Sequence, residues 1–175
     1  MTQPVAIRFN NPGALNTATW ICNLPGYIDA AETTPGNSTA RFDTPEHGVA
    51  AYWELLRRYR MRGITTVGSI ITTYGGGQDY SAYLSYVCEH SGLSRGDVID
   101  LHDDPQLLRL AKAMFQYEAG QPTPLTDAQI ITGFRLARAR VGRTVPRSQP
   151  REALSFWGQL GVWAYRYVQQ LMQRP

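Results

Sequence analysis

The hydrophobic pattern is clearest from residue 44 onward, where apolar positions recur every three or four residues. Thr44, Pro45 and Glu46 supply a hydroxyl cap, a proline at the first helical position and an acid in the first turn. The apolar positions that follow are Val49, Tyr52, Trp53, Leu56 and Tyr59. This spacing predicts an amphipathic helix that begins at Thr44.

The same spacing predicts further helices along the rest of the chain. They are expected over residues 66–74, 79–91, 104–120, 126–141 and 151–173. Two of them end at a glycine, Gly92 or Gly120, a residue that readily takes the left-handed conformation closing a helix. Asp104 before Pro105 is interpreted as a helix cap, and Thr126 with Gln129 as a capping box.

Residues 1–43 follow a different pattern, rich in Asn, Gly, Pro and Thr with short apolar pieces. Val5 to Phe9 is predicted as a strand. The turn sequence at 35–37 lies between Thr-rich arms and predicts a β-hairpin. The fold class expected is therefore α+β: a mostly helical domain with a small N-terminal β-hairpin region.

The domain organisation expected is one domain over residues 1–141, a linker over 142–150 and a C-terminal amphipathic helix within 151–175. The linker sequence, GRTVPRSQP, lacks apolar periodicity. The last helix is expected to pack on the domain, although docking of a carrier protein is an open alternative.

Composition excludes several classes of protein. The 175 residues are 43% hydrophobic and 18% charged, which is an ordinary globular balance. No apolar run approaches the roughly 20 residues that a membrane span requires. Cys22 and Cys88 are too few for a disulfide framework or a cysteine zinc site, and the three histidines show no metal-binding spacing. We therefore expect neither a metal nor a cofactor.

The net charge of +3 comes almost entirely from arginine, since Lys112 is the one lysine among 17 basic residues. A basic chain suits a polyanionic partner, either nucleic acid or an anionic cell-wall polymer, although genome base composition alone also produces arginine bias. Four arginines cluster over 57–62 without the interleaved aromatic residues of strand-binding surfaces, so nucleic acid is not expected.

Glu118 is the acid with the strongest claim to chemistry. It continues the apolar stripe of Leu107, Ala111 and Met114 at the end of a predicted helix. Apolar neighbours and the negative end of the helix dipole both disfavour the carboxylate and raise its pKa. An acid that stays protonated near neutral pH is what general-acid cleavage of a glycosidic bond requires. A solvated glutamate in a last helical turn is the alternative.

The predicted hairpin offers a second acid, Glu32 or Asp29, and glycosidases use such a carboxylate as nucleophile, base or cation stabiliser. The glycine run at 75–77 has neither the P-loop lysine nor the dinucleotide spacing. We interpret it as a loop lining a groove, with Tyr74, Gln78 and Tyr80 available to stack on or hydrogen-bond to a sugar. A plain helix-terminating loop explains it equally well.

Five short segments resemble, in order, a family of small phage-associated and secreted lysozyme-like proteins over about residues 5–120. The first is RFNNPGAL at 8–15, similar to an RxNNPGNL opening, in which Ala14 replaces the usual asparagine. The others are 42–51, 64–74, 79–87 and the closing EAG at 118–120. The resemblance implies a lysozyme-like peptidoglycan hydrolase, with residues 1–141 as its catalytic domain.

The chain also resembles autolysin-type glucosaminidases, in which a helix ending in ESGWG comes first. Here the corresponding pieces run NNPGAL, ETTPGNSTARF, DTPEHG and finally QYEAG, as in a circular permutation of the same site. On that mapping Glu118 is the general acid and Glu32 the hairpin acid. Asn10 and Asn11 would lie beside the cleft and contact substrate, together with Tyr74 and Gln78.

The predicted function is glycan-strand cleavage of peptidoglycan, as a muramidase, glucosaminidase or lytic transglycosylase. The chemistry-bearing segment starts close to residue 1, so we expect no cleavable signal peptide and synthesis in the cytoplasm. Action in the periplasm or cell wall then requires delivery, by phage as a lysin or by a secretion system as an antibacterial toxin, an effector with an immunity protein. The alternative is a non-catalytic virion or secretion-machine structural protein with the same fold.

Overall fold

The computed structural model describes residues 3–76 and 80–144. Met1–Arg140 forms one compact unit and Val141–Pro175 a second. Most of the predicted linker and the whole predicted C-terminal helix lie outside the described residues, as does Gln78.

The observed fold is α+β and mostly helical, as predicted. The described elements, in chain order, are α1 (Val5–Arg8), α2 (Thr19–Cys22), β1 (Tyr27–Thr34), β2 (Asn37–Phe42), α3 (Pro45–Met61), α4 (Val67–Tyr74), α5 (Ser81–Ser91), α6 (Asp104–Ala119) and α7 (Asp127–Thr144). α7 continues three residues beyond the predicted end at Val141, into the predicted linker. None of the described helices combines the length and apolarity needed to cross a bilayer.

The prediction of a strand at the N-terminus is wrong, because Val5–Arg8 forms the short helix α1. Its backbone bonds are helical: Arg8 N donates to Pro4 O at 3.0 Å and Phe9 N to Val5 O at 2.9 Å. The segment buries Ala6 and Phe9, three residues apart. A strand would bury alternate residues. Because the apolar run is short, its sequence fits both the strand period of two and the helical period of 3.6, and tertiary packing favours the helix.

The predicted hairpin is confirmed. β1 and β2 pair antiparallel, and Thr33 and Thr39 hydrogen-bond through their hydroxyls at 2.7 Å. The inner face of the hairpin packs with α2 and α3 around a small core. That core consists of Leu15, Ile21, Leu24, Ala40, Phe42 and Ala51.

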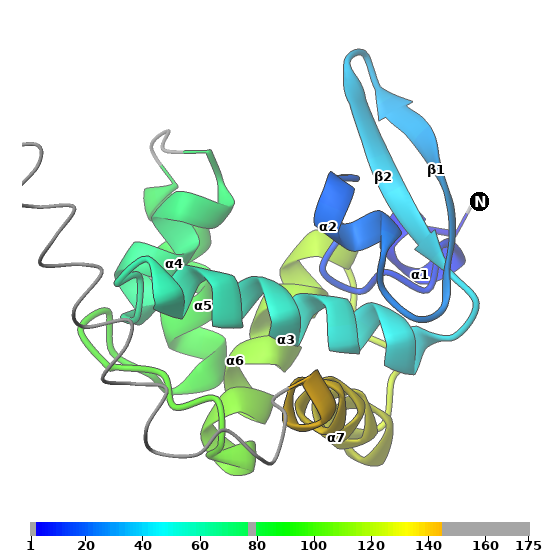
Figure 1. Ribbon diagram of the computed structural model, residues 1–175. Helices are drawn as coiled ribbons and strands as arrows, with labels where there is room; N and C mark the ends of the chain where they lie inside the picture. The colour runs from blue at the N-terminus through cyan, green and yellow to red at the C-terminus, as the bar shows by residue number, and fades with distance from the viewer. Residues whose placement is uncertain (1–2, 77–79, 145–175) are drawn as a thin grey trace, which may run out of the picture. The chain divides into compact units, whose positions relative to one another are not determined.

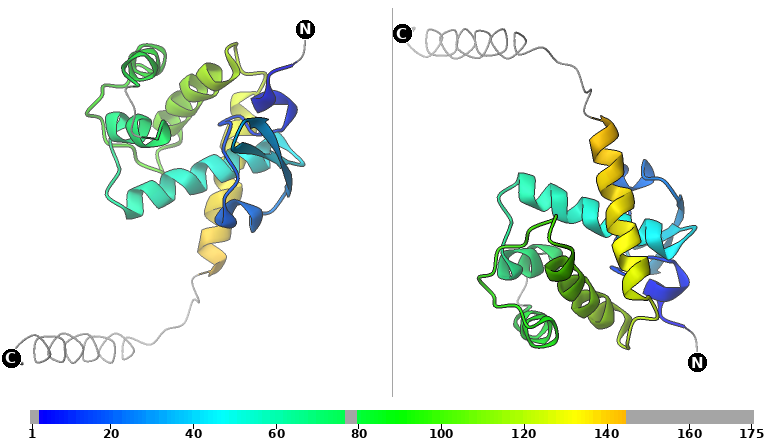
Figure 2. Two further views of the ribbon diagram at one scale, coloured as in Figure 1. Left: turned by 90° about the horizontal axis from the view of Figure 1, so that it is seen from above. Right: turned by 90° about the horizontal axis from the view of Figure 1, so that it is seen from below.

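Helix α3 runs across the unit, with the hairpin, α1 and α2 at its N-terminal end and α4 and α5 at its C-terminal end (Figure 1). Figure 2 shows α7 on the side of α3 opposite the hairpin. The buried stripe of α6 includes Leu107, Leu110, Met114 and Phe115, each fully inaccessible. The stripe that the sequence predicted, Leu107, Ala111 and Met114, is fully buried, and it leads to a half-buried Glu118 in the last turn of α6.

Helix caps follow the sequence with one correction. Thr44 accepts a hydrogen bond from His47 N at 3.3 Å, and Gln129 Oε1 accepts from Thr126 N at 3.1 Å, as the predicted caps require. The cap of α6 is Asp103 rather than Asp104, because Asp103 Oδ1 accepts from Gln106 N at 3.0 Å. Asp104 is the first helical residue and forms an ion pair with Arg138 of α7.

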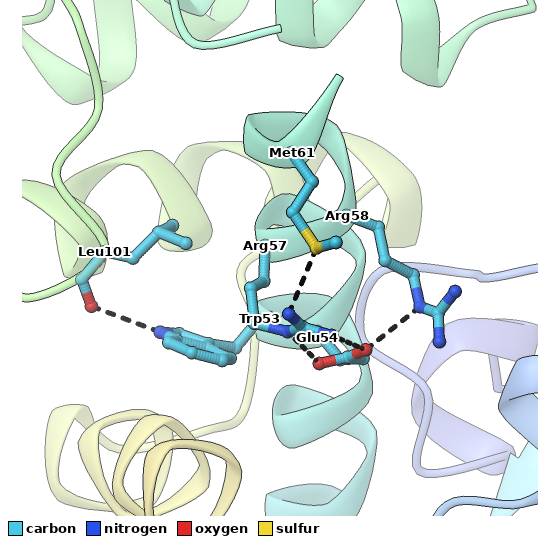
Figure 3. A network of polar contacts seen from close by, with 6 residues as sticks. All are labelled: Trp53, Glu54, Arg57, Arg58, Met61 and Leu101. Atoms are coloured by element: carbon cyan, nitrogen blue, oxygen red, sulfur yellow. Dashed lines mark hydrogen bonds and ion pairs between the residues drawn. The ribbon is translucent and has the colours of Figure 1, made fainter. Parts of the chain in front are cut away.

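A buried acid that the sequence analysis missed lies in the middle of α3. Glu54 is 7% exposed and is held by two arginines, Arg57 Nε at 2.7 Å and Arg58 Nε at 2.9 Å (Figure 3). Burial raises the pKa of Glu54, but hydrogen bonds and charge from the two arginines outweigh it and the net shift is downward. Arg58 also lies over the Trp20 ring, 4.7 Å from its centre, which connects α3 to α2. Glu54 is therefore an ionised structural acid and a poor proton donor.

Candidate active site

Glu118 lies in the last turn of α6, which ends at Gly120 in the left-handed conformation with φ of 62°. Its side chain is half-buried, whereas Ala119 and Phe115 beside it are buried. Burial raises the pKa of Glu118 above its usual range, and the nearby Tyr83 hydroxyl partly opposes the rise. The direction of this pKa shift agrees with the one expected from the apolar stripe of α6.

Tyr83 of α5 is a polar neighbour of Glu118. Its side chain is 2% exposed, and its hydroxyl is the buried polar atom that lacks a partner of good geometry within the described residues. The Tyr83 hydroxyl lies near enough to the Glu118 carboxyl to stabilise its charged form. The two groups do not reach the geometry of a full hydrogen bond. Burial, with the Tyr74 and Glu118 charges, raises the pKa of Tyr83 far above its usual range, so this hydroxyl keeps its proton.

Tyr74, a predicted substrate contact, lies at the end of α4 and joins this cluster. Its ring meets the Tyr83 ring edge-on, with centroids 6.3 Å apart, and its hydroxyl donates to the carbonyl of Gly13. Desolvation, and then the charge of Glu118, raises the pKa of Tyr74. The fold therefore brings together the NNPG loop, Tyr74 and Tyr83 of the consecutive helices α4 and α5, and Glu118 of α6.

The two asparagines of the NNPG loop are occupied by the scaffold. Asn11 is fully buried; its Nδ2 donates to Leu15 O at 3.0 Å and Ala40 O at 2.8 Å, and its Oδ1 accepts from Leu15 N at 3.0 Å. Asn10 Nδ2 donates to Phe42 O and Asp43 O, both at 3.1 Å. These bonds tie the loop to β2. Substrate contact by either side chain stays a prediction, and the inaccessibility of Asn11 counts against it.

The loop also fits closely against α3. A Cβ atom at Gly48 would lie 1.9 Å from the carbonyl oxygen of Asn10, so the first turn of α3 can approach the loop only with a glycine at this position. Asn10 and Ala14 have positive φ values of 50° and 48°. Asparagine tolerates that conformation better than alanine does.

Ala14→Asn is accordingly expected to stabilise the protein by about 0.5–1 kcal/mol, because it relieves left-handed strain at a half-buried alanine. Urea unfolding of the wild type and of Ala14→Asn measures the difference as a change of midpoint at unchanged slope. Ala128→Asn, at a helical position in the first turn of α7, is the matched control and is expected to give no gain. An Ala14→Asn protein that is less stable than the wild type would contradict the inference that Ala14 is strained by its left-handed conformation.

The hairpin acids each have a partner on the hairpin. Glu32 is exposed and its Oε1 accepts a hydrogen bond from Gly36 N in the turn, at 2.9 Å. Asp29 pairs with Arg41, with Oδ1 2.6 Å from Nε, and the Arg41 guanidinium holds the pKa of this carboxyl below its usual range. Asp29 is thus an ionised carboxylate. Neither the catalytic role predicted for Glu32 nor the alternative role for Asp29 is tested by these contacts.

The glycine run after α4 has a packing role at its first position. A Cβ atom at Gly75 would lie 2.1 Å from the ring of Tyr80, so the ring can cover this turn only when residue 75 is glycine. Tyr80 in turn meets Tyr83, with ring centroids 6.4 Å apart. Over residues 3–76 and 80–144 no group of three acidic, histidine or cysteine side chains could hold a metal ion.

Sequence reasoning gave no site role to the tyrosines of this region, Tyr83, Tyr86 and Tyr117. The signal was present in the sequence: Tyr80, Tyr83 and Tyr86 recur every third residue, which places aromatic rings along one face of a helix. Comparison of the chain with protein-family models and with curated proteins finds no match.

Tyr83→Phe is expected to raise the pKa of Glu118 further, because it removes the hydroxyl that stabilises the charged carboxylate. The change is measured by carbon NMR titration of the glutamate carboxyl signals, with Glu118→Gln used to assign the signal. Tyr59→Phe, which changes a buried tyrosine of α3, is the control and should leave the titration unchanged. An unchanged or lowered pKa in Tyr83→Phe would contradict the contact.

Proposed function

We propose that this protein cleaves the glycan strands of peptidoglycan, with Glu118 as the general acid. The observation that carries the proposal is the environment of Glu118: half-buried at the C-terminal end of α6, with a raised pKa, and with Tyr83 and Tyr74 near its carboxyl. An acid of this kind can deliver a proton to a glycosidic oxygen near neutral pH. The paired acids, Glu54 and Asp29, hold their protons less tightly and do not suit that role.

The sugar cation that forms as the glycosidic bond breaks needs a group that stabilises or captures it. Candidates are the carboxylate of Glu32 or of Asp29, the acetamido group of the substrate, or the substrate's 6-hydroxyl, which gives a transglycosylase product. Asp29 is kept ionised by Arg41, which suits electrostatic stabilisation of a cation. The proposed reaction requires no cofactor.

The proposal extends to partners and place of action. The substrate polymer lies outside the cytoplasmic membrane, so the protein acts in the periplasm or wall after delivery by a phage or a secretion system. An immunity protein that covers Glu118 would protect a producing cell. The basic net charge of +3 favours association with an anionic wall polymer.

The experiment that tests the proposal is turbidity loss of purified cell walls incubated with the purified protein. The released sugars are then analysed for new reducing ends, which indicate hydrolysis, or for anhydro ends, which indicate transglycosylation. Walls that keep their turbidity and release neither product refute the proposal.

A further inference from the structure

A row of aromatic rings leads away from Glu118 along α5. We name it the aromatic ridge and define it as Tyr80, Tyr83, Tyr86 and His90 of the α5 region together with Tyr117 of α6. The α5 members are spaced three, three and four residues apart, so they share one face of the helix. Over ten residues of helix the ridge extends roughly 15 Å.

The rings are packed on one another in sequence. Tyr117 stacks on Tyr83 with centroids 3.9 Å apart and planes within 7°. Tyr86 meets Tyr117 edge-on at 5.2 Å, and His90 stacks on Tyr86 at 3.8 Å. Each ring is thus held by its neighbour before any ligand arrives, which lowers the entropy cost of binding.

The ridge runs from the interior to the surface. Tyr83 is buried beside the Glu118 carboxyl, Tyr117 is 39% exposed, and His90 is exposed. Tyr83 connects the two features, because its ring supports Tyr117 while its hydroxyl lies near Glu118. The ridge therefore connects the exposed rings to the proposed general acid through the buried ring of Tyr83.

We propose that the aromatic ridge is a saccharide-binding subsite that holds successive sugar rings of the glycan chain on one side of the bond to be cleaved. This inference rests on the proposed function and adds the path of the substrate. The apolar C–H faces of pyranose rings pack on aromatic faces, while tyrosine hydroxyls and the histidine ring can hydrogen-bond to sugar hydroxyls. A glycan strand is a chain of sugar rings, so successive sugars can pack on successive aromatic side chains of the ridge.

The charges near the ridge favour a sugar chain over single-stranded nucleic acid, which also stacks on aromatic residues. The exposed Glu89 lies on α5, and the segment 81–91 contains no arginine or lysine. A phosphate backbone would find no arginine or lysine on this helix and would lie close to the Glu89 carboxylate. The sugar rings of a glycan strand are not linked by charged phosphates.

The test measures binding of N-acetylglucosamine oligomers of two to six units by calorimetry, using the full chain with Glu118→Gln so that no oligomer is cleaved. Affinity is expected to rise with oligomer length. Adding Tyr86→Ala should weaken hexamer binding about tenfold and leave dimer binding nearly unchanged, because the shorter oligomer does not reach that ring. Tyr86→Phe keeps the aromatic ring and is expected to keep the affinity.

His90→Ala provides a second variant at an exposed position, where loss of folding is not expected. Its matched control is His102→Ala, since His102 is exposed on the loop before α6 and lies outside the ridge. Hexamer binding weakened by His90→Ala but not by His102→Ala supports the ridge. Binding that Tyr86→Ala and His90→Ala both leave unchanged overturns it, as does the absence of any binding.

The failures of the two proposals are distinguishable. If walls are cleared in a Glu118-dependent way while the ridge variants bind hexamer normally, the cleavage proposal stands and the ridge is wrong. If the protein clears no walls but binds hexamer through Tyr86 and His90, the ridge stands as a sugar-binding surface and the cleavage proposal is wrong.

Discussion

Glu118→Gln is expected to lower the rate of cell-wall clearing by about 10²–10⁴-fold, the range that a general acid contributes. Glutamine has the same shape as glutamic acid but carries no acidic proton, so the glycosidic oxygen would leave unprotonated. The measurement is the initial rate of turbidity loss for the two proteins at equal concentration, at several pH values. Wild-type activity should fall on the alkaline side, as Glu118 loses its proton.

The same substitution should not unfold the protein. Because the pKa of Glu118 is raised in the folded state, the folded protein binds its proton more tightly than the unfolded chain, so this group costs stability as the pH rises above its ordinary value of 4.5. A neutral glutamine avoids that cost at neutral pH. Circular dichroism during thermal unfolding is expected to show a midpoint equal to or above that of the wild type.

Glu89→Gln is the matched control, because Glu89 is an exposed glutamate on the neighbouring helix α5. It should clear walls at the wild-type rate. A Glu118→Gln protein that is as active as the wild type would exclude Glu118 as the proton donor and leave the proposed function without its basis.

Asn11→Ala is expected to reduce the free energy of unfolding by about 2–4 kcal/mol, because Asn11 makes three buried hydrogen bonds. Removing the side chain leaves Leu15 N without its acceptor and Ala40 O without this donor, in a part of the protein closed to water. Urea unfolding followed by tryptophan fluorescence measures the loss as a lower midpoint at unchanged slope.

Asn23→Ala serves as the control for this prediction. Asn23 is exposed, and its Nδ2 donates to Thr19 O at 3.0 Å within the same short turn. Its replacement should cost less than about 0.5 kcal/mol. If Asn11→Ala proved as stable as the control, the structural role of the NNPG loop would have to be abandoned and a direct role in binding reconsidered.

The sequence by itself determined the elements whose signals are local. The described helices between residues 44 and 144 and the hairpin followed from apolar spacing, caps and turn residues, since a hydrogen bond to the fourth residue back or across a tight turn needs no distant partner. The apolar stripe of α6 also indicated that Glu118 would be drawn toward the interior. The same reasoning failed at Val5–Arg8, where four residues are too few to distinguish a period of two from a period of 3.6.

Only the tertiary structure decided what surrounds each polar group. Asn11 was predicted at the cleft and is enclosed by Leu15 and Ala40, while Glu54 went unnoticed and is the buried acid held by two arginines. Tyr83 meets Glu118 across a gap of 35 residues of chain. Desolvation and hydrogen bonding depend on neighbours that arrive from distant segments, and no local pattern along the chain specifies them.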